Sequence, residues 1–143
     1  MLAFQGTTVP SWLRQRLADA PAAGFTLFSA GNARDPVQVR RLTAGLQAAA
    51  RERQGAAADP PLLIATDQEG GQLLALGHGF TQLGSPMAIG ATGDATLAER
   101  VGRAIGRELR AVGVNVDYAP VLDVASHPAN PALGIRSFGD DPS

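Results

Sequence analysis

The feature that most constrains the fold is the stretch formed by residues 62–71. Its first five residues suit a strand that is buried on both faces, as the strands of parallel sheets are. Asp67, Glu69 and the glycine pair Gly70 and Gly71 follow at once. This order is expected where a parallel strand ends in an active-site loop, so the stretch predicts an α/β protein with a polar site at one edge of its sheet.

The rest of the chain alternates short apolar runs with amphipathic patterns. Strands are expected at residues 2–5, 24–28, 62–66 and 114–119, with 121–124 as an extension of the last one past Pro120. Helices are expected from residue 10 or 11, from residue 36 to about 53, and from residue 94 until Gly113. Asp35, Pro36 and Gln38 provide an N-cap, a first helical residue and a capping-box partner for the second of these helices.

The connections are expected to be loops, at residues 54–61 and, long and irregular, at 72–86. The resulting order β-α-β-α-β-α-β contains no hairpin signal. Right-handed crossovers between parallel strands would bring every loop that follows a strand to one edge of the sheet.

Three polar clusters would meet at that edge. They are Asp67 with Glu69, Asp123 near the end of the last strand, and the loop of residues 126–141 that contains Arg136. A carboxylate and a guanidinium that converge can each make bidentate, charge-assisted hydrogen bonds to vicinal hydroxyl groups. The combination suggests a small carbohydrate as ligand.

Structural roles are open alternatives for these residues. Asp67 could cap a turn whose geometry the following glycines allow. Arg136 could form a salt bridge with Asp140 or Asp141. Asp117 and Asp123 could be paired with a neighbouring Arg or Asn only to satisfy their burial.

Composition excludes several other classes. The formal net charge is -1, and all twelve basic residues are scattered Arg, which predicts solvated helix faces and no nucleic-acid partner. Cysteine is absent, and neither of the two His belongs to a metal-ligand spacing, so no metal site is expected. No apolar run approaches the ~20 residues of a membrane span, and the start lacks a signal-peptide pattern, so we expect no membrane association and a cytoplasmic location.

Four segments, in this order, resemble the amino-terminal domain of glycoside hydrolase family 3, and within it the bacterial β-N-acetylhexosaminidase branch. They are residues 64–71, 90–94, 108–124 and 130–142, and the similarity runs over nearly the whole chain in the expected order. The resemblance implies a (β/α)8 barrel, retaining hydrolysis of terminal β-linked N-acetylhexosamine, and no metal or organic cofactor. It also implies that Asp67 and Arg136 hold hydroxyl groups of the sugar whose bond is cleaved, and that Glu69 belongs to the loop architecture.

Members of that family use an Asp nucleophile and, in this branch, a His as acid and base, and both belong to later segments of the barrel. A whole barrel needs ~250 residues. Residues 1–143 are therefore expected to be the first half, about four βα units, of a barrel truncated after the fourth strand and its loop, with no catalytic residue and no activity alone. Open barrel edges would favour self-association.

One position departs from the family pattern. These hexosaminidases usually carry an Arg soon after the glycine pair, whereas this sequence has Ala75 in an apolar segment, residues 73–76. A β-glucosidase or β-xylosidase of the same family, or a non-catalytic sugar-binding half-barrel, is the alternative.

Overall fold

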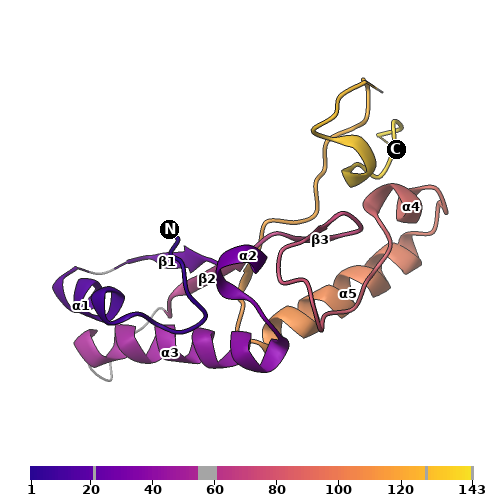
Figure 1. Cartoon of the computed structure of the whole chain (residues 1–143). Helices are drawn as coiled ribbons and strands as arrows, with labels where there is room; N and C mark the ends of the chain where they lie inside the picture. Colours follow the sequence, from indigo (N-terminus) through magenta and orange to yellow (C-terminus); the bar gives the residue numbers. More distant parts are fainter. Residues whose placement is uncertain (21, 55–60, 128, 143) are drawn as a thin grey trace.

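A parallel three-stranded sheet forms the centre of the computed structural model, which describes residues 1–20, 22–54, 61–127 and 129–142 (Figure 1). The strands are β1 (Gly24–Thr26), β2 (Leu63–Thr66) and β5 (Val116–Asp117), in the order β1-β2-β5. Leu2 adds a single parallel bridge to Phe25 beside β1. The predicted parallel α/β arrangement is therefore confirmed, and within the described residues the sheet remains open and does not close into a barrel.

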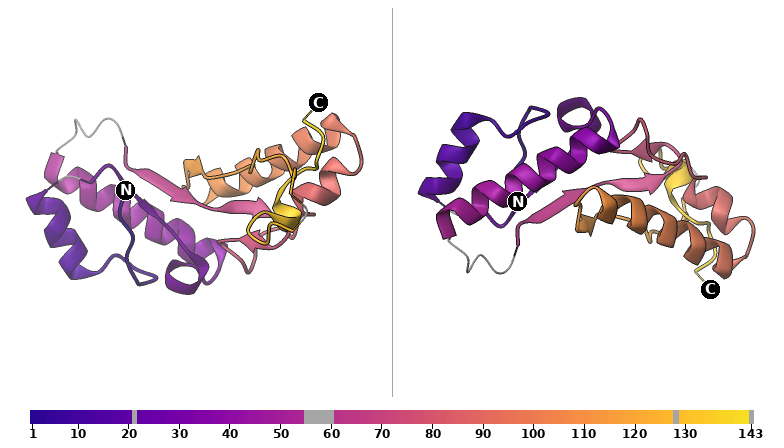
Figure 2. Two further views of the ribbon diagram at one scale, coloured as in Figure 1. Left: turned by 90° about the horizontal axis from the view of Figure 1, so that it is seen from above. Right: turned by 90° about the horizontal axis from the view of Figure 1, so that it is seen from below.

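Three long helices cover one side of this sheet. They are α1 (Ser11–Asp19), α3 (Pro36–Gln54) and α5 (Ala95–Ala111), and β2 runs between α3 and α5 in the view from above (Figure 2). The described residues also form three short helical segments: α2 (Ser29–Asn32), α4 (Pro86–Gly90) and the 3-10 turn η2 (Gly134–Arg136). No helix in the described part of the chain is both long and apolar enough to cross a membrane.

The two faces of the sheet have different surroundings. Phe25, Leu27 and Ile64 point toward the helices and are fully buried, together with Leu42 and Leu46 of α3. Side chains alternate between the two faces of a strand, so the residues between these point the other way. Leu63, with an exposed fraction of 45%, belongs to this second, open face.

The helix predictions are largely confirmed because their signals are local. Asp94 caps α5 by accepting hydrogen bonds from the backbone N–H groups of Thr96 and Leu97. Asp35 accepts from the N–H of Gln38 at the start of α3, but the Gln38 side chain accepts from Arg34 instead of closing the expected capping box. The predicted loop at residues 54–61 lies almost entirely outside the described residues.

The expectation that the chain has no hairpin was wrong. Strand β3 (Gln68–Gly70) pairs antiparallel with β4 (Leu73–Leu74) immediately after β2. Gly70 and Gly71 have φ angles of 88° and 59°, and they allow the chain to reverse where a residue with a Cβ would be strained. The hairpin takes up the first part of what was expected to be an irregular loop, and α4 begins at its last residue, Pro86.

All four expected strands are shorter than predicted, and the first and the last differ most. Residues 2–5 contribute only the Leu2 bridge, and the extension at residues 121–124 is not a strand. Pro120 has no backbone N–H to donate to a neighbouring strand, so the ladder ends before it. The chain instead leaves the sheet and carries the loop that contains Arg136.

Candidate functional site

Asp67 lies directly after β2, at the carboxyl end of the sheet, and its side chain is partly buried. Its backbone carbonyl accepts a hydrogen bond from the N–H of Ala75, at 3.0 Å, which ties the strand end to the far side of the hairpin. Within the described residues its carboxylate has neither a hydrogen-bond donor nor an ion-pair partner. Asp67 therefore retains a free acceptor group at the edge where parallel α/β proteins bind ligands.

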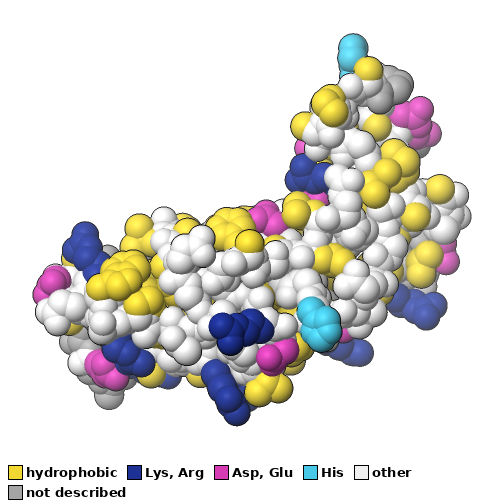
Figure 3. All heavy atoms as spheres, in the orientation of Figure 1, with side chains coloured by type: hydrophobic (Ala, Val, Ile, Leu, Met, Phe, Trp, Pro, Cys, Tyr) yellow, Lys and Arg dark blue, Asp and Glu magenta, His cyan; other side chains and the backbone are white. Residues whose placement is uncertain are grey.

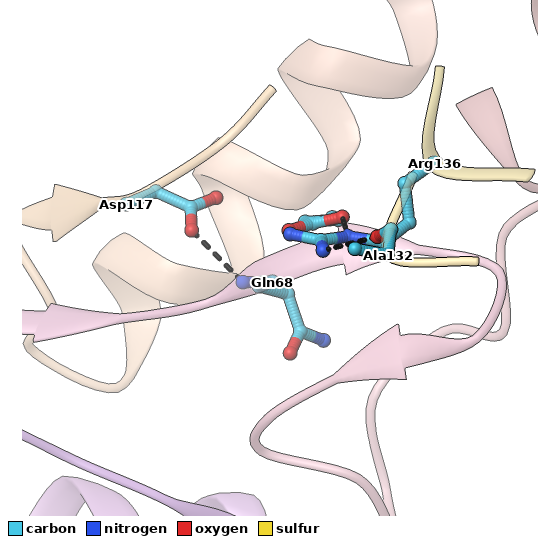
Figure 4. A network of polar contacts seen from close by, with 5 residues as sticks. Gln68, Asp117, Ala132 and Arg136 are labelled. Carbon is cyan, nitrogen blue, oxygen red and sulfur yellow. Dashed lines mark hydrogen bonds and ion pairs between the residues drawn. The ribbon is translucent and has the colours of Figure 1, made fainter. Parts of the chain in front are cut away.

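Arg136 reaches the same edge from the C-terminal loop and forms a bidentate ion pair with Glu69 of β3. Its Nε donates to one carboxylate oxygen at 2.8 Å and its Nη2 to the other at 2.6 Å. Its Nη1 donates to the carbonyl of Ala132, at 3.0 Å, as Figure 4 shows. The guanidinium is thus held on two sides by groups from different parts of the chain.

Burial differs sharply between the two partners. The Glu69 side chain is 1% exposed, whereas that of Arg136 is 31% exposed. The hydrogen bonds to Glu69 raise the pKa of Arg136 above its ordinary value, with further electrostatic contributions from Glu69, Asp67 and Asp123. The geometry therefore places a covered carboxylate behind a cation that still faces solvent.

Asp117, at the end of β5, is the other carboxylate of this network. Its Oδ1 accepts a hydrogen bond from the backbone N–H of Gln68 at 2.9 Å (Figure 4). Burial raises the pKa of Asp117, the bond from Gln68 opposes that rise, and the nearby charges of Asp67 and Glu69 add to it. The carboxylate thus joins β5 to the start of the hairpin that carries Glu69.

The loop that carries Arg136 is fixed by its own polar and packing contacts. The fully buried Ser137 hydroxyl contacts the carbonyl oxygens of Asp123 at 2.6 Å and Gly139 at 2.9 Å. On the other side, Gly90 of α4 lies against the backbone of Phe138. These contacts connect the Arg136 turn to α4 and to the segment that leaves β5.

The structure settles some of the structural alternatives. Arg136 has Glu69 as its ion-pair partner, where Asp140 or Asp141 had been the alternative. Asp117 accepts from a backbone amide, where an Arg or Asn side chain had been considered. Glu69, which was expected only to shape a loop, is a buried strand residue with a charged partner.

Sequence reasoning missed the Glu69–Arg136 pair and the role of Ser137. Glu69 and Arg136 are far apart in the chain, and no spacing rule connects a strand residue with a loop of that length. A partial signal existed, because two consecutive glycines after a strand favour a hairpin turn and would have placed Glu69 in a strand.

In the described residues no group of three or more His, Asp or Glu side chains has a metal-binding arrangement.

Comparison with known proteins gives the family. The family model for the glycosyl hydrolase family 3 N-terminal domain matches residues 7–143. "Beta-hexosaminidase A" of Pseudoalteromonas piscicida is 39% identical over 142 residues, which are 96% of this chain and 23% of that protein. "Beta-hexosaminidase" of Pseudomonas aeruginosa (strain LESB58) is 37% identical over 143 residues, which are 99% of this chain and 40% of that protein.

Solved structures agree. The glycoside hydrolase family 3 β-N-acetylglucosaminidase from Paenibacillus sp. str. FPU-7 superimposes with a TM-score of 0.91 and 39% identity over 99% of this chain and 26% of that one. NagZ from Neisseria gonorrhoeae, solved with N-trifluoroacetyl-D-glucosamine, gives a TM-score of 0.85 and 31% identity over 99% of this chain and 41% of that one. The chain thus spans less than half the length of these relatives. The sequence, the parallel βα architecture and the match to the family model together establish that this chain belongs to glycoside hydrolase family 3, within its N-terminal domain.

Proposed function

We propose that this chain supplies the sugar-holding part of a β-N-acetylhexosaminidase, an enzyme that hydrolyses terminal β-linked N-acetylhexosamine with retention. In this proposal its βα units are the first half of a (β/α)8 barrel. The observation that carries it is the convergence of Asp67 and the ion-paired Arg136 at the carboxyl edge of the sheet. The names of the relatives, hexosaminidases and N-acetylglucosaminidases, support the substrate class.

The proposal assigns binding to these two residues. The free Asp67 carboxylate accepts hydrogen bonds from sugar hydroxyl groups, and the remaining N–H groups of Arg136 donate to sugar oxygens. Bond cleavage with retention needs a nucleophilic carboxylate and an acid/base group about 5 Å apart. We assign that pair to the parts of such an enzyme that lie outside these residues, so the 143-residue chain alone should not turn over substrate.

A chimaera tests the substrate class directly. Residues 1–143 would replace the matching segment of the Pseudomonas aeruginosa relative, which is 37% identical over this length. The folded chimaera should hydrolyse an aryl β-N-acetylglucosaminide in preference to the matching β-glucoside and β-xyloside, and Asp67→Ala or Arg136→Ala should abolish the hydrolysis. Asp19→Asn, on the exposed surface of α1, is the control. A preference for the glucoside or xyloside would favour the alternative specificity, and turnover by residues 1–143 alone would contradict the assignment of the chemistry.

We also propose that the chain pairs with a second copy of itself through the open face of the sheet. Leu2, Phe28, Leu63 and Tyr118 are each 45% to 49% exposed, and apolar side chains gather above β1 and β2 in Figure 3. The sheet also has unpaired edges, which favour association. Sedimentation should show a dimer or larger species that Leu63→Lys disrupts and Leu122→Lys, outside the sheet, does not; a monomeric wild-type chain would contradict this.

The cytoplasm is our proposed compartment, because a sequence without cysteine is compatible with reducing surroundings. Cell fractionation with an antibody against this domain tests it, and recovery from the periplasm or medium would contradict it.

A further inference from the structure

The Glu69–Arg136 pair leaves a defined set of donors for a ligand. A guanidinium has five N–H groups. Nε and Nη2 each donate one N–H to Glu69, and Nη1 donates one to the Ala132 carbonyl. One N–H therefore remains on each terminal nitrogen of a side chain that is 31% exposed.

Glu69 also fixes the direction of these donors. Its carboxylate is covered, and it sits in β3, next to Gln68. The N–H of Gln68 is bound to Asp117 and its side-chain oxygen accepts from the N–H of Leu76. The anchored Glu69 carboxylate fixes the orientation of the Arg136 guanidinium plane, because two parallel hydrogen bonds join the two groups.

Several carboxylates surround Arg136 before a ligand arrives. Glu69 neutralises it directly, and Asp67 and Asp123 act on it electrostatically. Asp117 adds its interactions with Asp67 and Glu69. Among the described residues, this neighbourhood therefore has more carboxylates than guanidinium groups, which disfavours an anionic ligand and leaves neutral hydroxyl oxygens as suitable acceptors.

From these contacts we infer that Glu69 is a positioning and specificity-determining residue, which orients Arg136 toward the hydroxyl groups of a neutral sugar and makes the site reject sugars that carry a carboxylate. The inference rests on the proposed function, since it concerns the same sugar site. It adds a residue with no expected ligand contact, and it explains how an Arg can serve a neutral ligand without attracting anions.

The test compares binding of N-acetylglucosamine and of glucuronic acid to the 143-residue chain by NMR, in the wild type and in Glu69→Gln. The glutamine keeps the shape of the side chain and removes its charge. The variant should lose the protected Arg136 Nε–H signal, bind N-acetylglucosamine about tenfold more weakly, and gain affinity for glucuronic acid relative to the wild type. Glu99→Gln, which removes an exposed ion pair with Arg103, is the matched control and should change none of these.

Each result has one meaning. Unchanged sugar preference in a folded Glu69→Gln variant would overturn this inference alone. A wild-type chain that binds neither sugar, while it keeps the Arg136 Nε–H signal, would overturn the proposed function and with it this inference. If the Glu69→Gln variant does not fold, the test uses the wild-type chain saturated with N-acetylglucosamine. The Arg136 Nε–H signal should then persist. Its loss would show that the sugar displaces Glu69 from Arg136, and this would overturn the inference.

Discussion

Gly90 of α4 lies so close to Phe138 that a Cβ at position 90 would be 1.8 Å from the Phe138 carbonyl oxygen. The obstacle is backbone, which cannot rotate away as a side chain can. This contact seats the loop that carries Arg136 against α4, two residues from the guanidinium-bearing position. The site therefore depends on a glycine that touches no ligand.

Gly90→Ala should displace the loop around residue 138 and weaken the Arg136–Glu69 pair. Overpacking of this kind costs about 1–3 kcal/mol of the free energy of unfolding, which urea denaturation measures. Gly102→Ala is the control, because a Cβ there would meet nothing within 4 Å. That variant should be stabilised by up to about 1 kcal/mol, since alanine is favoured over glycine within a helix. Equal effects of the two substitutions would refute the role of the close contact.

Arg136→Ala should destabilise the chain strongly, because it leaves the buried carboxylate of Glu69 without its cation. Breaking a buried pair from one side typically costs about 3–5 kcal/mol. The double variant Glu69→Leu with Arg136→Met should recover much of this loss, since it removes both charges. Arg103→Ala, which breaks the exposed pair with Glu99, should cost at most about 0.5 kcal/mol. A loss at Arg136 as small as that at Arg103 would contradict the importance of burial.

Asp117 should make stability depend on pH in a particular direction. Burial raises its pKa above the ordinary value of 3.8 in the folded chain. The folded state then holds the proton more tightly than the unfolded state, so protonated Asp117 favours folding most at low pH. This contribution to the free energy of unfolding is lost as the pH rises from about 3.8 through the raised pKa of the folded state. Asp117→Asn should remove this dependence while its side-chain oxygen still accepts from Gln68. Parallel pH profiles of unfolding for the two proteins would contradict the prediction.

Ser137→Ala should loosen the Arg136 loop from inside. The buried hydroxyl contacts the carbonyl oxygens of Asp123 and Gly139. Its removal takes this donor away, although the Gly139 carbonyl still accepts from the N–H of Ala125. The expected loss is about 0.5–1.5 kcal/mol in thermal or urea unfolding. Ser126→Ala, at an exposed position in the same loop region, should have little effect. A similar loss in both variants would point to the loop as a whole instead of to the Ser137 hydroxyl.

Sequence alone determined the parts of this protein that depend on local signals. Periodicity and caps predicted α3 and α5 closely, because an N-cap and an apolar stripe act within a few residues. The alternation of strands and helices predicted the parallel sheet, and the motifs predicted the family. Asp67 and Arg136 were named as site residues from the same motifs, and their sugar-binding role stays a prediction.

Only the tertiary structure decided which charges meet. Glu69 and Arg136 are joined because a glycine turn folds β3 back beside β4 and because Gly90 admits the loop of residue 138 against α4. Neither event leaves a periodic pattern in the sequence. The hairpin depends on the positive φ angles of Gly70 and Gly71, and the contact of Gly90 with Phe138 depends on the absence of a Cβ between distant segments. The partner of a buried charge is set by which segments pack together, and that is a property of the whole fold.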